Sequence, residues 1–173
     1  MKRAVVTILV VSLAGLAGCV APPAQPADPR PVSRPTVAPL PTVAPVAVAE
    51  GAVAPGVWTY GSDARGSRAL FGQAGSDALL VLRCDRAARR VYLSVPGNDA
   101  GTLTLRASNL VKGVAARPTG ATPAYVAAEL APTDPVLDAL AFSRGRFSVA
   151  IDTRQTTVPA WPEFTRVVED CRA

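Results

Sequence analysis

The chain of 173 residues contains no histidine. This absence excludes a serine or cysteine nucleophile activated by histidine in the usual way, and it excludes a histidine-ligated zinc site. The sequence also lacks a glycine-rich phosphate loop followed by lysine and serine or threonine, and it lacks a GxSxG elbow. We therefore predict that the protein is not an enzyme and that it uses neither a metal nor a cofactor.

The first residues of the chain are arranged as in a secretory signal peptide. A basic start at Lys2 and Arg3 is followed by an apolar run and then by small residues that lead to Cys19. The apolar run is shorter than the roughly 20 residues that a membrane-spanning helix needs, which argues against an uncleaved transmembrane helix. We predict that residues 1–18 form a signal peptide that is removed.

The cleavage region carries a specific motif. The stretch Leu16-Ala17-Gly18-Cys19 resembles the lipobox of bacterial lipoproteins. This resemblance covers only the first 19 residues, and it implies that Cys19 becomes the first residue of the mature chain and carries a diacylglyceryl group. Val20 stands where an aspartate would resemble the signal for retention in the inner membrane. The resemblance thus implies a lipid anchor through Cys19 in the outer membrane, on its periplasmic side.

Residues 19–55 are rich in proline and alanine. Proline at this density removes amide donors and favours polyproline II, so neither a helix nor a sheet propagates. We interpret the segment as a disordered tether, which at about 3.1 Å per residue reaches on the order of 100 Å when stretched. The PxxP spacing of Pro26 and Pro29 leaves a recognition ligand as the alternative.

Cysteine is scarce, with three residues in the whole chain. If Cys19 carries a lipid, Cys84 and Cys171 remain, and such a pair in an oxidising compartment predicts one disulfide. In the chain-entropy model this bond would stabilise the fold by about 4–5 kcal/mol. A metal or redox pair is the alternative, but neither a CxxC spacing nor a histidine supports it.

Alternating apolar and polar residues dominate the sequence after the tether. A period of two is typical of antiparallel strands with one buried face. The segments that show it are 78–84, 91–95, 102–106, 125–130 and 147–152, with turn residues between them. In the first segment Cys84 shares a face with Leu80 and Leu82, so we expect this thiol to point inward.

Two segments have helical spacing instead. The first begins at Asp134, a capping residue followed by proline, and Gly145 is suited to end it. The second begins near Trp161-Pro162, and its apolar face includes Cys171. Because both thiols then face a common core, we expect a disulfide that staples the C-terminal helix to the strands.

These patterns predict one globular domain over residues 56–173, of the mainly β (α+β) class. We expect an antiparallel sheet, or a small sandwich or barrel, of about 6–8 strands. A short helix near residues 135–142 and a C-terminal helix near residues 162–171 complete the prediction.

Two arginines, Arg144 and Arg146, flank Gly145 where the first helix meets the next strand. We predict that they form an anion-binding site for a carboxylate or phosphate of the cell envelope. The structural alternative is a helix end, in which Gly145 is left-handed and Phe142 and Phe147 enter the core. Another residue with two interpretations is the proline-flanked Trp161. It fits either a partner contact, which we include in the predicted binding site, or packing over a helix start.

Catalytic candidates are weak. Asp134 and Asp138 are four residues apart and could pair on one helical face, but the capping role already accounts for Asp134. Lys112 is the lysine available to activate a serine, and Ser108 is the nearest serine. We therefore assign no catalytic residue.

The formal net charge of the chain is +5. Such a charge is compatible with anionic lipid headgroups or cell-wall carboxylates as partners. We expect no nucleic-acid partner, because the anchor places the domain outside the cytoplasm. In layout the chain is similar to small periplasmic accessory domains such as the invasion-associated locus B group, and to small lipoprotein lysozyme inhibitors.

We therefore predict a non-enzymatic envelope module that contacts the membrane through its lipid anchor and binds an envelope protein or an anionic cell-wall or lipid component. The alternatives are an envelope hydrolase with serine or carboxylate chemistry and an enzyme inhibitor.

Overall fold

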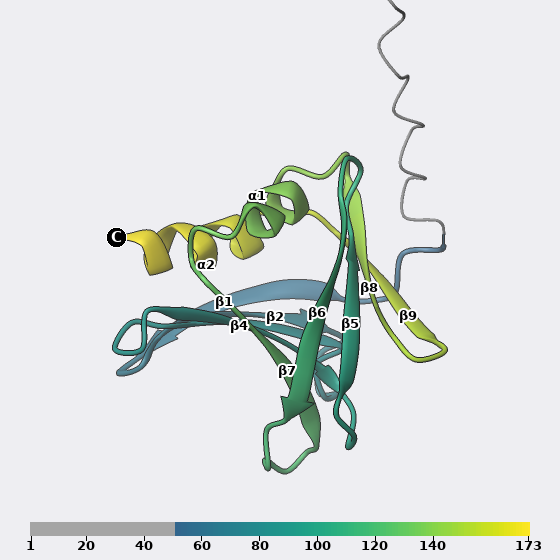
Figure 1. Ribbon diagram of the computed structural model, residues 1–173, viewed down its shortest axis with the longest axis horizontal. Helices are drawn as coiled ribbons and strands as arrows, with labels where there is room; N and C mark the ends of the chain where they lie inside the picture. Colours follow the sequence, from purple (N-terminus) through teal and green to yellow (C-terminus); the bar gives the residue numbers. More distant parts are fainter. Residues whose placement is uncertain (1–50) are drawn as a thin grey trace, which may run out of the picture. The chain divides into compact units, whose positions relative to one another are not determined.

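The computed structural model describes residues 51–173. The predicted signal peptide, Cys19 and the tether up to residue 50 lie outside the described residues. Within the described part, no helix is long and apolar enough to cross a membrane. The chain forms nine strands and two helices (Figure 1). In order these are β1 (Val57–Asp63), β2 (Gly66–Gly72), β3 (Leu80–Asp85), β4 (Arg90–Pro96), β5 (Gly101–Arg106), β6 (Val111–Pro118), β7 (Tyr125–Leu130), α1 (Pro135–Ala141), β8 (Arg146–Ile151), β9 (Arg154–Pro159) and α2 (Pro162–Arg172).

The strands form one antiparallel sheet in the order β1-β2-β3-β4-β7-β6-β5-β8-β9. This confirms the predicted mainly β class with two helices, and the number of strands exceeds the expected range. Strands β1, β2, β3 and β4 follow one another in the sheet as they do in the sequence. Strand β7 then pairs with β4, so the β5–β6 hairpin lies on the far side of β7. The sheet is strongly bent, so β5, β6 and β8 run crosswise to β1, β2 and β4 (Figure 1).

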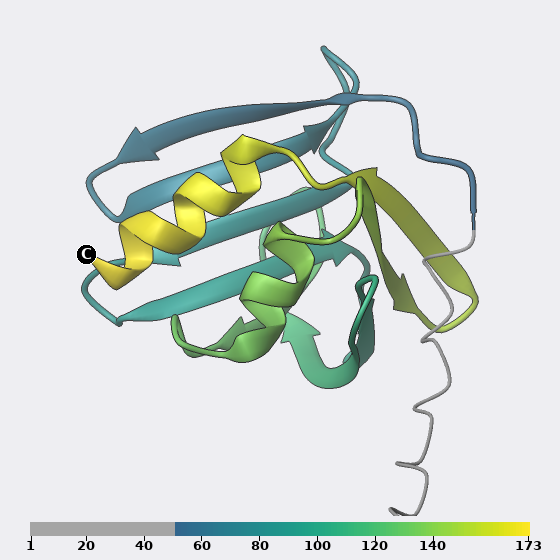
Figure 2. The same cartoon turned by 90° about the horizontal axis from the view of Figure 1, so that it is seen from above.

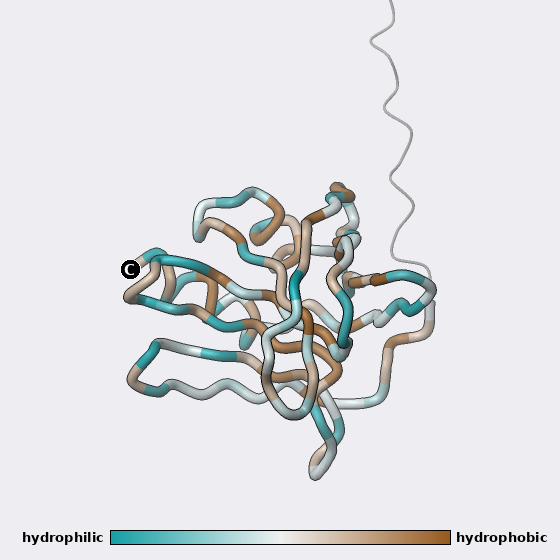
Figure 3. The backbone as a smooth tube through the Cα atoms, turned by 60° about the horizontal axis from the view of Figure 1, so that its bottom comes forward, coloured by the Kyte–Doolittle hydropathy of each residue, from teal (hydrophilic) through white to brown (hydrophobic). Residues whose placement is uncertain are grey.

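One face of the sheet is covered by the helices. Figure 2 shows α2 lying along β1, β2 and β3, with α1 beside it. Four aromatic residues form the centre of this core, with ring centroids 5.3 Å apart for Trp58 and Phe71 and 5.0 Å apart for Phe147 and Phe164. The indole Nε1 of Trp58 donates a hydrogen bond to the Pro159 carbonyl (2.8 Å), which ties β1 to the end of β9. Hydrophobic segments accordingly gather in the middle of the molecule (Figure 3).

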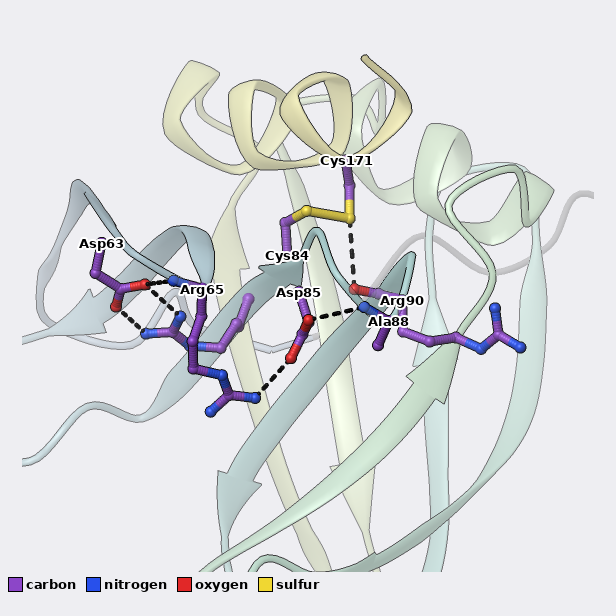
Figure 4. Close-up of polar contacts among 8 residues, drawn as sticks. Asp63, Arg65, Cys84, Asp85, Ala88, Arg90 and Cys171 are labelled. Atoms are coloured by element: carbon purple, nitrogen blue, oxygen red, sulfur yellow. Dashed lines mark hydrogen bonds and ion pairs between the residues drawn. A yellow bond between two sulfur atoms is a disulfide. The ribbon is translucent and has the colours of Figure 1, made fainter.

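The predicted disulfide between Cys84 and Cys171 is confirmed. Cys84 lies on β3 opposite Val91, and Cys171 lies in the last turn of α2. Their Cα atoms are 5.3 Å apart, and both residues are buried against the sheet (Figure 4). The bond therefore holds the end of α2 on the covered face.

The five predicted strands are present, and four others were not predicted. In β1, β6 and β9 the apolar pattern is weak: β9 is an edge strand with the sequence RQTTVP, and most residues of β6 are exposed. The fourth, β2, does alternate, since Ser67, Ala69 and Phe71 are buried on one side. Leu70 on the opposite side obscures that alternation, because it adds an apolar residue to the outward face.

The predicted helix near residues 135–142 is confirmed, including its start at Asp134, but the expectation that Gly145 ends it is wrong. Asp134 caps the helix by accepting a hydrogen bond from the Val136 amide (3.0 Å). The helix ends at Ala141 with Phe142 as its C-cap, because the Phe142 amide makes the last i to i−4 bond, to Asp138. Gly145 does adopt the left-handed region (φ 75°), but in the turn that leads into β8. Phe142 does not enter the core, since it is 72% exposed, whereas Phe147 is fully buried.

Candidate functional site

The sheet face opposite the helices holds a groove of about 900 Å³. Its floor comes from residues of β3, β4 and β7 that point away from the core, and one wall comes from the end of β6 and the loop after it. The residues that line it are Arg65, Val81, Arg83, Tyr92, Ser94, Val114, Ala115, Arg117, Pro118, Thr119, Ala121, Tyr125, Ala127 and Glu129. The middle of the groove is thus lined by small and apolar residues. The lining also contains three arginines and one glutamate.

Two of these arginines are held by carboxylates. The Arg83 guanidinium makes two hydrogen bonds to Asp63, of 3.1 Å and 2.7 Å. Arg65 donates to Asp85 (2.8 Å) from the turn between β1 and β2 (Figure 4). These contacts hold the pKa of both carboxyl groups below its usual value: the Arg83 bond is the main cause at Asp63, and the Arg65 bond is the main cause at Asp85. Both acids therefore stay ionised and fix their arginines at the rim.

Arg117 differs from the other two. It lies on β6 beside Ala127, which in turn pairs with Ser94 of β4. Among residues 51–173 the exposed Arg117 side chain makes no ion pair and no hydrogen bond, and the hydroxyl of the buried Ser94 has no hydrogen-bond partner either. The Tyr92 hydroxyl in the lining has no hydrogen-bond partner among these residues either, so the groove presents one guanidinium and two hydroxyls that are available to a ligand.

Tyrosines mark the two ends of the groove floor. Tyr92 pairs with Glu129, and Tyr125 pairs with Pro96, so the two tyrosines are four residue positions apart along paired strands. At about 3.3 Å per residue this separation is about 13 Å. Tyr125 donates from its hydroxyl to the Ala78 carbonyl (2.6 Å), and partial burial raises its pKa. The ring of Tyr125 is thereby fixed, and the groove is long enough for an extended ligand.

The residues that the sequence offered as catalytic candidates, Lys112, Asp134 and Asp138, form ion pairs within the fold. Lys112 Nζ lies 2.6 Å from Asp134 Oδ2, and Asp138 pairs with Arg172 at 2.8 Å. Burial raises the pKa of Asp134, but the bonds from Lys112 and from the Val136 amide outweigh it and lower the pKa overall. The two aspartates are thus not brought together as a carboxylate pair, and neither they nor Lys112 line the groove.

The predicted binding residues Arg144, Arg146 and Trp161 lie away from the groove. The chain brings them to one end of the sheet, where the Ala160 amide donates to the Gly145 carbonyl (3.1 Å). Arg144 is exposed and Arg146 is half-buried, and Trp161 is 41% exposed at the N-cap of α2. Trp161 therefore does not pack fully over the helix start.

A second cavity, of about 870 Å³, lies along α2 and includes Trp161 in its lining. Some of its charged side chains have partners: the Arg166 guanidinium stacks 4.1 Å from the centre of the Tyr60 ring, and the Tyr60 hydroxyl donates to Asp170 (2.8 Å). The buried Oε2 atom of Glu163, by contrast, has no hydrogen-bond partner among the described residues. Within residues 51–173 no cluster of three or more histidine, cysteine, aspartate or glutamate residues is suited to a metal ion. This cavity thus presents an unpartnered carboxylate oxygen, whereas the groove presents an unpartnered guanidinium and is the one suited to an anion.

Comparisons with protein-family models, with curated proteins and with solved structures find no match for this chain. The groove and its geometry are therefore the basis for a functional proposal. Sequence reasoning missed Arg117 and Tyr125 as site residues. A signal was present in the outward positions of the strands, where Arg83, Tyr92 and Ser94 share one face, but the strand order that joins them to β6 and β7 is not readable from local patterns.

Proposed function

We propose that this protein is a lipid-anchored, non-enzymatic module of the bacterial cell envelope, and that its groove binds a carboxylate-bearing component of the cell wall. The observation that carries the proposal is the unpartnered Arg117 in a groove whose other two arginines are already neutralised. A guanidinium matches the planar geometry of a carboxylate and binds it through two parallel hydrogen bonds. The free guanidinium is therefore the group that selects an anion.

The rest of the groove supports a ligand that is more than a simple anion. Alanine, valine and proline side chains form its middle, and two tyrosines bound its floor. Such surfaces bury the apolar faces of sugar rings or peptide side chains, while a few polar groups fix their orientation. Asp85, Asp63 and Arg90 neutralise Arg65, Arg83 and Glu129 respectively, so Arg117 leaves a single net positive charge at the groove, which favours approach of an anionic polymer.

The expected anchor and tether give the proposal its location. A lipid on Cys19 with a spacer on the order of 100 Å long would let the domain reach a polymer next to the membrane. Tethering also raises the local concentration of the domain at that polymer, so a weak groove interaction would suffice. The enzyme alternative has no such support, because Lys112 and Asp134 neutralise each other and Asp138 pairs with Arg172.

The test is co-sedimentation of the mature, lipidated protein in detergent with purified peptidoglycan. We expect the wild-type protein to pellet with the polymer, and we expect Arg117→Gln to lower the affinity at least tenfold, because a charge-assisted contact to a carboxylate is lost. The matched control is Arg154→Gln, which removes the same charge from β9, outside the groove lining. It should bind like the wild-type protein at moderate salt.

Equal losses from both variants would show that binding follows net charge and would contradict a groove site. Binding to peptidoglycan whose carboxylates have been amidated should also be weak, and undiminished binding would exclude the carboxylate as the recognised group. Mass analysis of the mature N-terminus tests the anchor separately: a free Cys19 thiol would contradict lipidation and leave the groove result unaffected.

A further inference from the structure

Three loops meet at the end of the sheet that carries α1. They are the β5–β6 turn, the α1–β8 loop and the corner between β9 and α2. The Ser108 amide donates to Ser143 Oγ (3.0 Å), Ser143 Oγ donates to the Arg146 carbonyl (2.5 Å), and the Ala160 amide donates to the Gly145 carbonyl (3.1 Å). These bonds join the loops into one surface, which we call the loop end and define as residues 106–110, 142–146 and 160–161.

The loop end exposes aromatic side chains together with arginines. Phe142 is 72% exposed and Trp161 is 41% exposed, the two most exposed positions for aromatic rings in the described chain. Arg144, two residues after Phe142, is also exposed. The loop end contains no acidic residue. Arg144 and Arg146 make no side-chain hydrogen bond or ion pair with any described residue. Exposed rings next to unneutralised guanidinium groups have no evident role in stability.

We propose that the loop end docks on the surface of an anionic lipid bilayer, with Phe142 and Trp161 in the headgroup region and Arg144 and Arg146 on lipid phosphates. Tryptophan favours the membrane interface because its indole N–H remains near water while the rest of the ring system is buried, and phenylalanine adds an apolar ring that is buried among the acyl chains. Each arginine near an anionic surface adds about a fivefold preference for the bound state. The proposal rests on the proposed lipid anchor, which would keep the domain close to such a surface.

Docking in this way leaves the groove accessible. Strand β6 runs from Val111, next to the β5–β6 turn, to Arg117 and Pro118 in the groove wall. At about 3.3 Å per residue, the two ends of this strand are about 20 Å apart. Figure 1 shows the β5–β6 turn and the β6–β7 loop at opposite ends of these strands. A domain bound through its loop end would thus present the groove away from the bilayer.

Fluorescence quenching distinguishes docking from simple anchoring. The mature lipidated protein is inserted into vesicles of zwitterionic lipid with and without about one third phosphatidylglycerol, and a fraction of the lipids carries brominated acyl chains. Trp58 is 4% exposed in the core and provides a nearly constant background, so quenching reports on Trp161. We expect strong quenching in anionic vesicles and little in purely zwitterionic ones, and we expect Trp161→Phe to remove the quenched component.

A separate double variant tests the contribution of the two arginines to docking. Arg144→Gln together with Arg146→Gln should lower the ratio of docked to undocked protein about 25-fold in anionic vesicles, since two fivefold preferences are lost. Arg86→Gln with Arg89→Gln, in the β3–β4 turn, is the matched control and should leave the quenching unchanged. Absence of quenching in anionic vesicles, or equal effects of the two double variants, would overturn the proposal. Peptidoglycan binding and its Arg117 dependence are measured without vesicles, so either proposal can fail alone.

Discussion

The covered and open faces of the same strands differ in what their residues do. On β3 and β4 the inward residues Leu80, Leu82 and Leu93 are completely buried under the helices. The outward residues of these strands include Arg83, Tyr92 and Ser94, which line the groove. Burial of apolar area explains the first set, because it is the dominant favourable contribution to folding. No comparable gain explains the second set, and this contrast is why the open face is the place to look for a ligand.

The largest expected effect is on the covered face. Phe147→Ala removes a ring that is fully buried and 5.0 Å from the ring of Phe164, so we expect the free energy of unfolding to fall by about 3–5 kcal/mol. Urea denaturation followed by circular dichroism measures this change. Tyr92→Ala on the open face should cost much less. If the two variants lost similar stability, the two faces would not differ in the way described.

The next effect concerns the bond that holds α2 on the covered face. Replacing Cys84 and Cys171 together by alanine should lower the free energy of unfolding by about 2–5 kcal/mol, because the unfolded chain is no longer constrained. Urea denaturation with and without a reductant provides the control, since the double variant should not respond to the reductant while the wild-type protein should. A variant as stable as the oxidised wild-type protein would show that the packing of α2 alone fixes it.

The two faces also differ in how far the sequence predicts them. Period-two patterns predict the strands around Leu82 and Val149, and the helical period predicts that Cys171 points to the core, because burial imposes these spacings. The extent of α1 was predicted to within a residue, but the role of Gly145 was not, since a glycine suited to a helix end also suits any left-handed turn.

The groove was not predictable from the sequence for a different reason. Arg117 on β6 reaches the site only because β7 returns to pair with β4 and carries β6 beside it. Such pairing between distant segments depends on the whole chain, and no local pattern encodes it. The lipid anchor at Cys19 and the tether up to residue 50 stay predictions, because they lie outside the described residues.

The smallest expected change in stability is at Arg117 itself. This side chain is exposed and makes no polar contact among residues 51–173, so Arg117→Gln should change the free energy of unfolding by less than about 0.5 kcal/mol. The same urea denaturation measures it, with Arg83→Gln as the comparison because Arg83 has two hydrogen bonds to Asp63 to lose. A stable Arg117→Gln variant that no longer binds peptidoglycan would separate binding from folding at a single residue. A large loss of stability would instead mean that Arg117 supports the fold, and the open face would then resemble the covered one.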